Sequence, residues 1–120
     1  MILPADNISV SSWGGPAFDV GELVEHKRYG YRGLVVARDL KCKAPDEWYE
    51  SNKTKPHRDQ PWYHVLIDGT ISVTYAAQSS LRADPSRAEI THPLLSAFFD
   101  DFHEGRYARN ERPWPGWKDH

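Results

Sequence analysis

The sequence predicts a small, mainly β domain of the SH3-like barrel type, followed by a C-terminal helix. The stretch 60–69 is a nearly unbroken apolar strand that ends in Asp68-Gly69, and a second β-rich run, Ile71–Ala77, follows at once. Two such runs around an Asp-Gly turn are a strong hairpin signal. Five Trp, six Tyr and four Phe in 120 residues also suit a small β-rich core, because aromatic rings bury much area per residue.

Length and composition indicate one domain in a reducing compartment. A chain of 120 residues buries roughly two thirds of its unfolded surface. Cys42 is the single cysteine, which excludes an intrachain disulfide and favours a cytoplasmic location. The sequence has neither the roughly 18-residue apolar run of a membrane span nor the pattern of a signal peptide, so no membrane association is expected.

The first half of the chain predicts an arm and two strands. Residues 1–17 are rich in Pro, Gly and Ser and read as a flexible arm, with Trp13 as a potential anchor. We place the β-barrel domain at 18–84. Its first strand is predicted at Val20–His26 and its second, rich in β-branched residues, at Leu34–Arg38.

The centre of the predicted barrel is the strand in the 60–69 stretch. Alternation places Trp62, His64 and Leu66 on one face and Tyr63 and Val65 on the other. Both faces are largely apolar, so we expect a central strand covered on both sides. The predicted structural core comprises Trp48, Trp62, Tyr63, His64, Leu66 and Tyr75. Pro45–Glu50 predicts a short helical turn with acids near its N-terminus.

Residues 85–120 are expected to hold a helix at about 93–104 and an extended tail. Pro93 suits a first helical position and Gly105 suits the position just past a helix. The apolar residues of this segment recur at helical spacing: Leu94, Leu95, Phe98, Phe99 and Phe102. The favoured interpretation is packing on the barrel; the alternative is a partner-binding face made of Leu95, Phe98, Phe99 and Phe102.

Catalysis is not expected. Cys42 with His26 or His64 as its base has no supporting local sequence, and a lone cysteine is more often inert packing. His64 and Asp68 share a strand face but would lie about 13 Å apart, too far to bind one metal ion. No Gly-rich phosphate loop occurs. We therefore expect no enzyme activity, no cofactor, no metal and no small-molecule substrate.

Charge is segregated along the chain in a way that the net charge of −2 hides. Residues 1–25 hold four acids and no Lys or Arg, whereas residues 26–58 hold nine Lys or Arg against four acids. Cations interleaved with flat rings suit phosphate contacts and base stacking. The candidate nucleic-acid-binding residues are Lys27, Arg28, Tyr29, Tyr31, Arg32, Lys41, Lys43, Lys53, Lys55 and Arg58. The competing interpretation is a solvated loop with no binding role.

Two sequence blocks resemble a known family. His26-x-Arg28-Tyr29-x-Tyr31-Arg32-Gly33 and Gln60-Pro61-Trp62-Tyr63-His64, in this order and spacing, are similar to the YccV-like hemimethylated-DNA-binding domain found in the heat shock protein HspQ. The resemblance covers about residues 18–82. It implies a small SH3-like barrel without catalysis.

The resemblance implies two alternative functions. One is DNA binding, with a possible preference for hemimethylated DNA; the other is a protein-interaction adaptor for an ATP-dependent protease of the Lon or Clp type in the stress response. The sequence departs from the family at Gln78–Leu81, and its tail from Ile90 looks more like the segment that follows this domain in F-box proteins.

Overall fold

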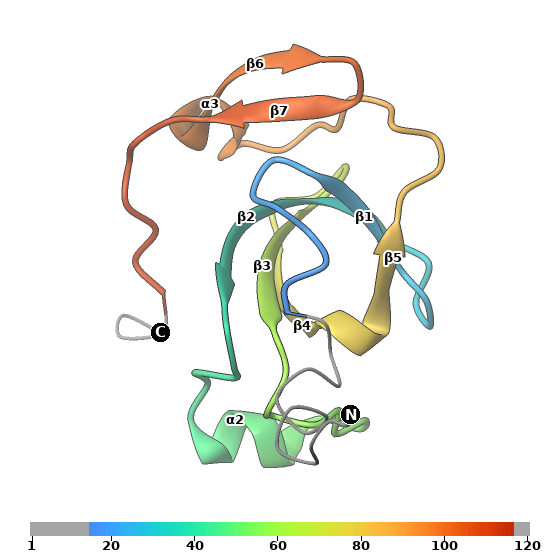
Figure 1. The fold of residues 1–120 in the computed structure, drawn as a ribbon, viewed down its shortest axis with the longest axis vertical. Coiled ribbons are helices and arrows are strands. Elements are labelled where there is room, and N and C mark those ends of the chain that lie inside the picture. The colour runs from blue at the N-terminus through green and yellow to red at the C-terminus, as the bar shows by residue number, and fades with distance from the viewer. Residues whose placement is uncertain (1–14, 117–120) are drawn as a thin grey trace, which may run out of the picture.

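The structure, a computed structural model that describes residues 15–116, is built on a five-stranded antiparallel sheet of order β4-β3-β2-β1-β5 (Figure 1). This confirms the prediction of a mainly β fold. The strands are β1 (Leu23–His26), β2 (Arg32–Asp39), β3 (Trp62–Ile67), β4 (Val73–Ala77) and β5 (Leu81–Ala83).

The sheet curls strongly without closing (Figure 1). Its two end strands, β4 and β5, follow each other in the chain through the 3₁₀ turn η1 (Gln78–Ser80), but in the described part of the chain they do not pair with each other. The SH3-like closure of the sheet therefore stays a prediction.

Strand β3 is an interior strand of the sheet, next to the edge strand β4. It pairs with β2 on one side and β4 on the other, and its residues from Trp62 to Leu66 are buried. Tyr63 and Val65 pack against Val24 and Val35, whereas Leu66 belongs to a core on the opposite face. The expectation of a central strand covered on both faces is confirmed.

Local turn chemistry shifts the strand ends. The strand expected from Val20 begins only at Leu23, because Gly21 adopts φ +98°, where side-chain-bearing residues are strained. Strand β2 extends beyond the predicted segment at both ends. The predicted helical turn is present as α2 (Asp46–Ser51), with Asp46 and Glu47 in its first turn.

The helix expected at about 93–104 is wrong in extent. Helix α3 covers only Leu95–Phe98, and the chain then forms a hairpin of β6 (Phe99–His103) and β7 (Arg106–Arg109). Glu104 and Gly105 both have positive φ, the conformation of a two-residue type I′ hairpin turn. Gly105 thus belongs to a hairpin turn and does not follow a helix.

Cross-strand pairing explains the aromatic spacing that had suggested a helix. Phe102 faces Tyr107 across the hairpin, with ring centroids 4.6 Å apart, and Phe99 contacts the same tyrosine at 5.8 Å. Such aromatic pairs stabilise antiparallel strands. Asp100 and Asp101, which suit the end of a helix poorly, are simply exposed on β6.

The C-terminal segment completes the hydrophobic core. Its buried residues Ile90, Phe98, Phe99 and Tyr107 form one cluster with residues of β1, β2 and β3, among them Leu34. Figure 1 shows the hairpin lying over one end of the curled sheet. Tyr107, a residue of that hairpin, is buried. The segment packs on the sheet, as the favoured interpretation held.

The N-terminal segment is described only from Gly15. The Ala17 backbone N–H donates to the Tyr63 hydroxyl at 3.1 Å and to Gln78 Oε1 at 2.7 Å, so the last residues of the expected arm are tied to the sheet. Trp13 and the rest of that arm lie outside the described residues. Within residues 15–116, no helix has the length and apolar character needed to cross a bilayer.

Candidate functional site

A groove with a volume of about 300 Å³ lies along β4, one of the two edge strands of the sheet. One wall is the turn between β1 and β2, and the other is α2 with the loop that follows it. We call it the aromatic groove. Its lining residues are His26, Tyr29, Tyr31, Trp48, Tyr49, Ser51, Asn52, Lys53, Thr54, Pro56, Trp62, Thr74, Tyr75, Ala76, Ala77 and Ser80.

A packed aromatic cluster fixes the wall on the α2 side. Trp62 of β3 stacks on Tyr75 of β4 at 5.3 Å, and Trp48 of α2 contacts both rings edge-on, at 6.2 and 5.8 Å. The Tyr75 hydroxyl donates to Asp39 Oδ2 at 2.6 Å and accepts the Lys43 backbone N–H at 3.0 Å. Burial, followed by the hydrogen bond to Asp39, raises the pKa of Tyr75, so this phenol stays neutral.

His26 shapes the opposite wall. Its Nδ1 accepts the backbone N–H groups of Arg28 and Tyr29, both at 3.1 Å, and its ring stacks on Tyr29 at 4.7 Å. Burial, and then the charge of Arg28, lower the pKa of His26 below 6.5, so the ring is neutral at pH 7. Because Nδ1 is an acceptor, the ring proton of the neutral form resides on Nε2.

Tyr31 connects the β1–β2 wall of the groove to strand β4. Its side chain hydrogen-bonds Thr74 of β4, and its ring lies 5.1 Å from His26. Burial raises the pKa of Tyr31 to about 12. Tyr29, by contrast, is 59% exposed and presents its ring to solvent at the groove mouth.

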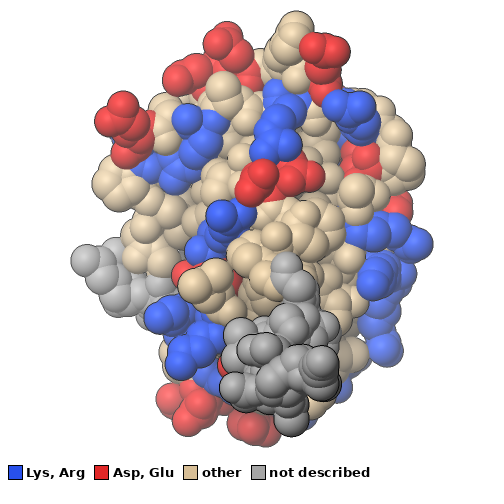
Figure 2. All heavy atoms as spheres, viewed as in Figure 1, with Lys and Arg blue, Asp and Glu red and all other residues tan. Residues whose placement is uncertain are grey.

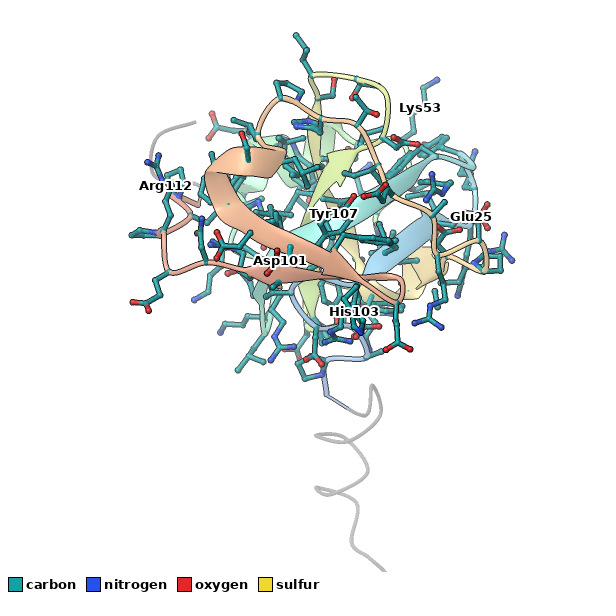
Figure 3. The ribbon with its side chains drawn as sticks, turned by 90° about the horizontal axis from the view of Figure 1, so that it is seen from above. Glu25, Lys53, Asp101, His103, Tyr107 and Arg112 are labelled. Carbon is teal, nitrogen blue, oxygen red and sulfur yellow. The ribbon has the colours of Figure 1, made fainter. Side chains whose placement is uncertain are left out.

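The charge at the groove is positive. Among the described lining residues, Lys53 is the one Lys or Arg and none is Asp or Glu. The Lys27 Nζ donates to the Ser79 carbonyl at 3.1 Å, which holds a second ammonium beside the lining residue Ser80. Lys55 Nζ similarly donates to the Asn52 carbonyl at 3.2 Å. Figure 3 shows Lys53 at the periphery of the molecule.

The structure therefore brings together part of the predicted set. Tyr29, Tyr31 and Lys53 line one groove although they come from two different loops, and Lys27 and Arg28 share the turn that carries the tyrosines. Over the face in Figure 2, Lys and Arg gather beside the β1–β2 turn and β5, and elsewhere they alternate with Asp and Glu. On the face drawn in Figure 2 the cations thus do not form one continuous basic patch.

Arg32 is engaged inside the protein. Its Nε donates to Asp84 at 2.8 Å, one terminal nitrogen donates to Asp68 at 2.9 Å, and the other donates to the Ala88 carbonyl. The Asp84 side chain is only 2% exposed. These contacts join β2, the β3–β4 turn and the segment after β5, which is a structural role.

Arg58 is held in a similar way. It donates to the Ala44 carbonyl at 2.6 Å, and its guanidinium lies 4.8 Å from the ring centre of Tyr49 and 3.6 Å from Asp46. Lys41 and Lys43 are exposed on the loop between β2 and α2, and neither lines the groove.

The alternative partner-binding face is mostly covered. Phe98 and Phe99 are 7% and 5% exposed, and Leu95 and Phe102 are partly buried against the same core. Of the predicted core residues, Trp62, Tyr63, His64, Leu66 and Tyr75 are buried and Trp48 is half-buried.

No constellation typical of catalysis is found among the described residues. Cys42 is buried against Trp62 and Tyr75, and burial raises the pKa of its thiol, which disfavours the nucleophilic thiolate. His64 Nε2 lies 3.6 Å from Asp39 Oδ2, and the His64 ring contacts the Tyr75 ring with centroids 4.4 Å apart. Within residues 15–116, no three His, Cys, Asp or Glu side chains are grouped for a metal ion.

Sequence reasoning missed the double role of several groove residues. His26 was predicted as a strand end and weighed as a base for Cys42, and Trp48, Trp62 and Tyr75 were predicted as core, although all four also line the groove. The signal for His26 was its position two and three residues before backbone N–H groups of a Gly-containing turn, where a side-chain acceptor is useful.

Comparison with known proteins identifies the family of this chain. The family described as "Hemimethylated DNA-binding protein YccV like" matches residues 16–106. The F-box only protein 21 of Homo sapiens, Pongo abelii and Mus musculus is 33% identical over 96 residues in each case, which covers 78% of this chain. The chain spans about 15% of the length of these relatives. Because the family match runs from the residues before β1 to the start of β7, most of the domain is covered and the chain belongs to the YccV-like family.

Proposed function

We propose that this domain is a non-enzymatic DNA-binding module and that the aromatic groove with its cationic rim is the contact surface. The observation that supports this most is the convergence of Tyr29, Tyr31 and Lys53 on a groove whose described lining has no acid. The family description, which names hemimethylated DNA, supports the choice of ligand.

The chemistry of the groove suits nucleic acid on two counts. Ammonium groups at the rim, from Lys27, Lys53 and Lys55, neutralise phosphates, and the tyrosines offer stacking surfaces. The engaged guanidiniums of Arg32 and Arg58 take no direct part. The number of phosphates neutralised is therefore small, and affinity for random sequence is modest.

The experiment is a fluorescence anisotropy titration of short GATC duplexes in the hemimethylated and unmethylated states over a range of salt concentrations. Each phosphate neutralised contributes about −0.9 to the slope of log affinity against log salt. Lys53→Ala lowers the magnitude of that slope by about 1. The matched control is Lys41→Ala, an exposed lysine outside the groove, which leaves the slope unchanged.

The two levels of the proposal fail separately. Equal affinity for hemimethylated and unmethylated duplexes at physiological salt removes the methylation preference but leaves DNA binding. Absence of binding to every duplex at low salt removes DNA as the ligand. If Lys41→Ala lowers the magnitude of the salt slope as much as Lys53→Ala does, the groove is not the DNA-binding site.

The second candidate is a protein-interaction adaptor or specificity factor for an ATP-dependent protease of the Lon or Clp type. Two observations favour it: relatives named as F-box proteins, and apolar side chains at the start of the edge strand β4, where Ile71 is 84% and Val73 36% exposed. An edge strand accepts an added strand from a partner. Binding to a purified Lon or Clp protease with weak salt dependence, lost in Ile71→Asp and Val73→Asp, supports this candidate; no binding to either protease opposes it.

A further inference from the structure

We infer that the aromatic groove receives a single unstacked base, so that the domain reads DNA by drawing one nucleotide out of the helix rather than by contacting a stacked duplex. This inference rests on the proposed function and specifies the ligand state that the groove accepts. It follows from the shape of the groove, from the position of its rings and from its charge.

The shape excludes a stacked duplex from the interior of the groove. The site is a concavity between the β1–β2 turn and the α2 side, with β4 as its floor, and its volume of about 300 Å³ is at the lower limit for small-ligand sites. A base inside a duplex has its faces covered by its neighbours and cannot enter such a concavity. An extruded base exposes both faces and its pairing edge.

The rings are placed to meet an extruded base. Tyr29 stands at the groove mouth, 59% exposed and stacked on His26. The Tyr31 ring also contacts His26, and its side chain is held to Thr74 of the floor. A ring fixed by a stacking partner loses little freedom when a base stacks on it. Stacking on aromatic side chains accepts any base and is a substantial part of single-strand affinity.

The polar groups of the groove suit a nucleotide, which offers acceptors on its base edge and negative charge on its phosphates. Neutral His26 carries its proton on Nε2, a donor for a carbonyl or ring nitrogen on a base edge. Lys53 in the lining and Lys27 beside it supply cations for the flanking phosphates. Since no acid lines the described groove, the anionic backbone meets no repulsion there.

The experiment compares three fluorescein-labelled probes of one sequence: a fully paired duplex, the same duplex with one unpaired base, and the single strand. The unpaired base has no pairing to break and less stacking to lose than a paired base, so the bulged duplex binds about tenfold or more tighter than the paired one. A 2-aminopurine placed at the unpaired position changes its fluorescence on binding because it stacks on protein rings.

Two variants at one position locate the effect. Tyr29→Ala reduces affinity for the bulged duplex by about 5- to 150-fold, the range for loss of one stacked base, and barely changes affinity for the paired one. Tyr29→Phe keeps the ring and keeps the preference. Ile71→Ala, at an exposed apolar residue outside the groove, is the control and changes neither.

The outcomes separate this inference from the function on which it rests. Equal affinity for paired and bulged duplexes, or a Tyr29→Ala loss that is the same for both, overturns the single-base pocket while DNA binding stands. No binding to any of the three probes overturns the proposed function itself. Displacement of the bulged duplex by an apolar peptide but not by excess single strand assigns the groove to a protein ligand and also overturns the inference.

Discussion

The backbone N–H of Tyr107 donates to the carbonyl oxygen of Gly21 at 3.0 Å, which joins β7 to the residue two positions before β1. A Cβ built on Gly21 would overlap with the Tyr107 carbonyl oxygen, and Gly21 also has φ +98°. Both the approach of the two backbones and the conformation require glycine at this position.

Replacing Gly21 with alanine is expected to destabilise the protein through β7. The unfavourable φ costs of order 1–3 kcal/mol, and relief of the overlap with Tyr107 moves the β6–β7 hairpin off the sheet. Urea denaturation followed by Trp fluorescence measures the loss. Gly69→Ala is the comparison: it also has positive φ, at 76°, but open space around it, so its effect is smaller. Equal effects of the two substitutions would show that the close approach contributes nothing.

Arg32→Ala is expected to lower the free energy of unfolding by about 3 kcal/mol, because it leaves the buried carboxylate of Asp84 without its cation. Arg28→Ala, on the exposed turn, leaves stability nearly unchanged. Thermal or urea unfolding of the two variants tests this, and DNA titrations of Arg32→Ala are interpretable only where it is folded. If Arg32→Ala is as stable as the parent, Arg32 is free to bind phosphate.

Asp84 predicts a loss of stability in acid. Burial by itself raises the pKa of this carboxyl, but the hydrogen bonds from Arg32 and Ser86 outweigh burial, so the pKa lies below 3.8. The ionised Asp84 therefore contributes fully to the free energy of unfolding above pH 3.8. This contribution is lost as the pH falls further, because the unfolded chain binds the proton first and the folded protein binds it only at lower pH. Asp84→Asn, which cannot ionise, should show a shallower decline of unfolding free energy below pH 3.8 than the parent.

His26 predicts a second, separate pH dependence. Burial and the charge of Arg28 hold its pKa below 6.5, so below pH 6.5 the unfolded chain binds a proton that the folded chain does not. The free energy of unfolding therefore falls as the pH drops from 6.5 toward the folded-state pKa. His26→Asn keeps an acceptor for the turn but does not titrate, so the difference between parent and variant isolates this group from the other histidines. A constant difference across that range would contradict the assignment.

Tyr107→Phe is expected to cost about 1–3 kcal/mol, since the buried Ile90 N–H that donates to the tyrosine hydroxyl at 3.0 Å loses its acceptor. The ring contacts with Phe99 and Phe102 remain, so the hairpin should keep its structure. Amide hydrogen exchange at Ile90 reports the change directly. Unaltered protection of that amide would mean that another acceptor replaces the hydroxyl.

The elements that could be predicted from the sequence are those whose signals come from residues close together in the chain. The apolar run of β3, the strand after its turn and the acidic start of α2 all carry local signals, and each was placed correctly within a few residues. The Phe98–Phe102 segment was misassigned, because its spacing suits both a helix face and a strand with a bulge. The register shift between Phe99 and Asp101 decides for the strand, and only the partner strand makes it visible.

The candidate site was predictable in its residue types and not in its assembly. Tyr29 and Tyr31 stand out as rings among cations, but their proximity to Lys53 depends on how far β2 carries the chain before α2 turns back. Arg32 was chosen for its neighbours Tyr29 and Tyr31. Its real partners, Asp68 and Asp84, lie 36 and 52 residues away in the chain, and no local pattern indicates them.

The shared core of sheet and hairpin has a practical consequence for anyone expressing a shorter fragment. A chain cut after Ala83 would keep all five strands of the sheet and yet leave Leu34, Val36 and Leu66 facing water, because Ile90, Phe98, Phe99 and Tyr107 are what covers them. Such a fragment would aggregate rather than serve as a minimal domain, and the smallest useful boundary on the C-terminal side lies beyond β7.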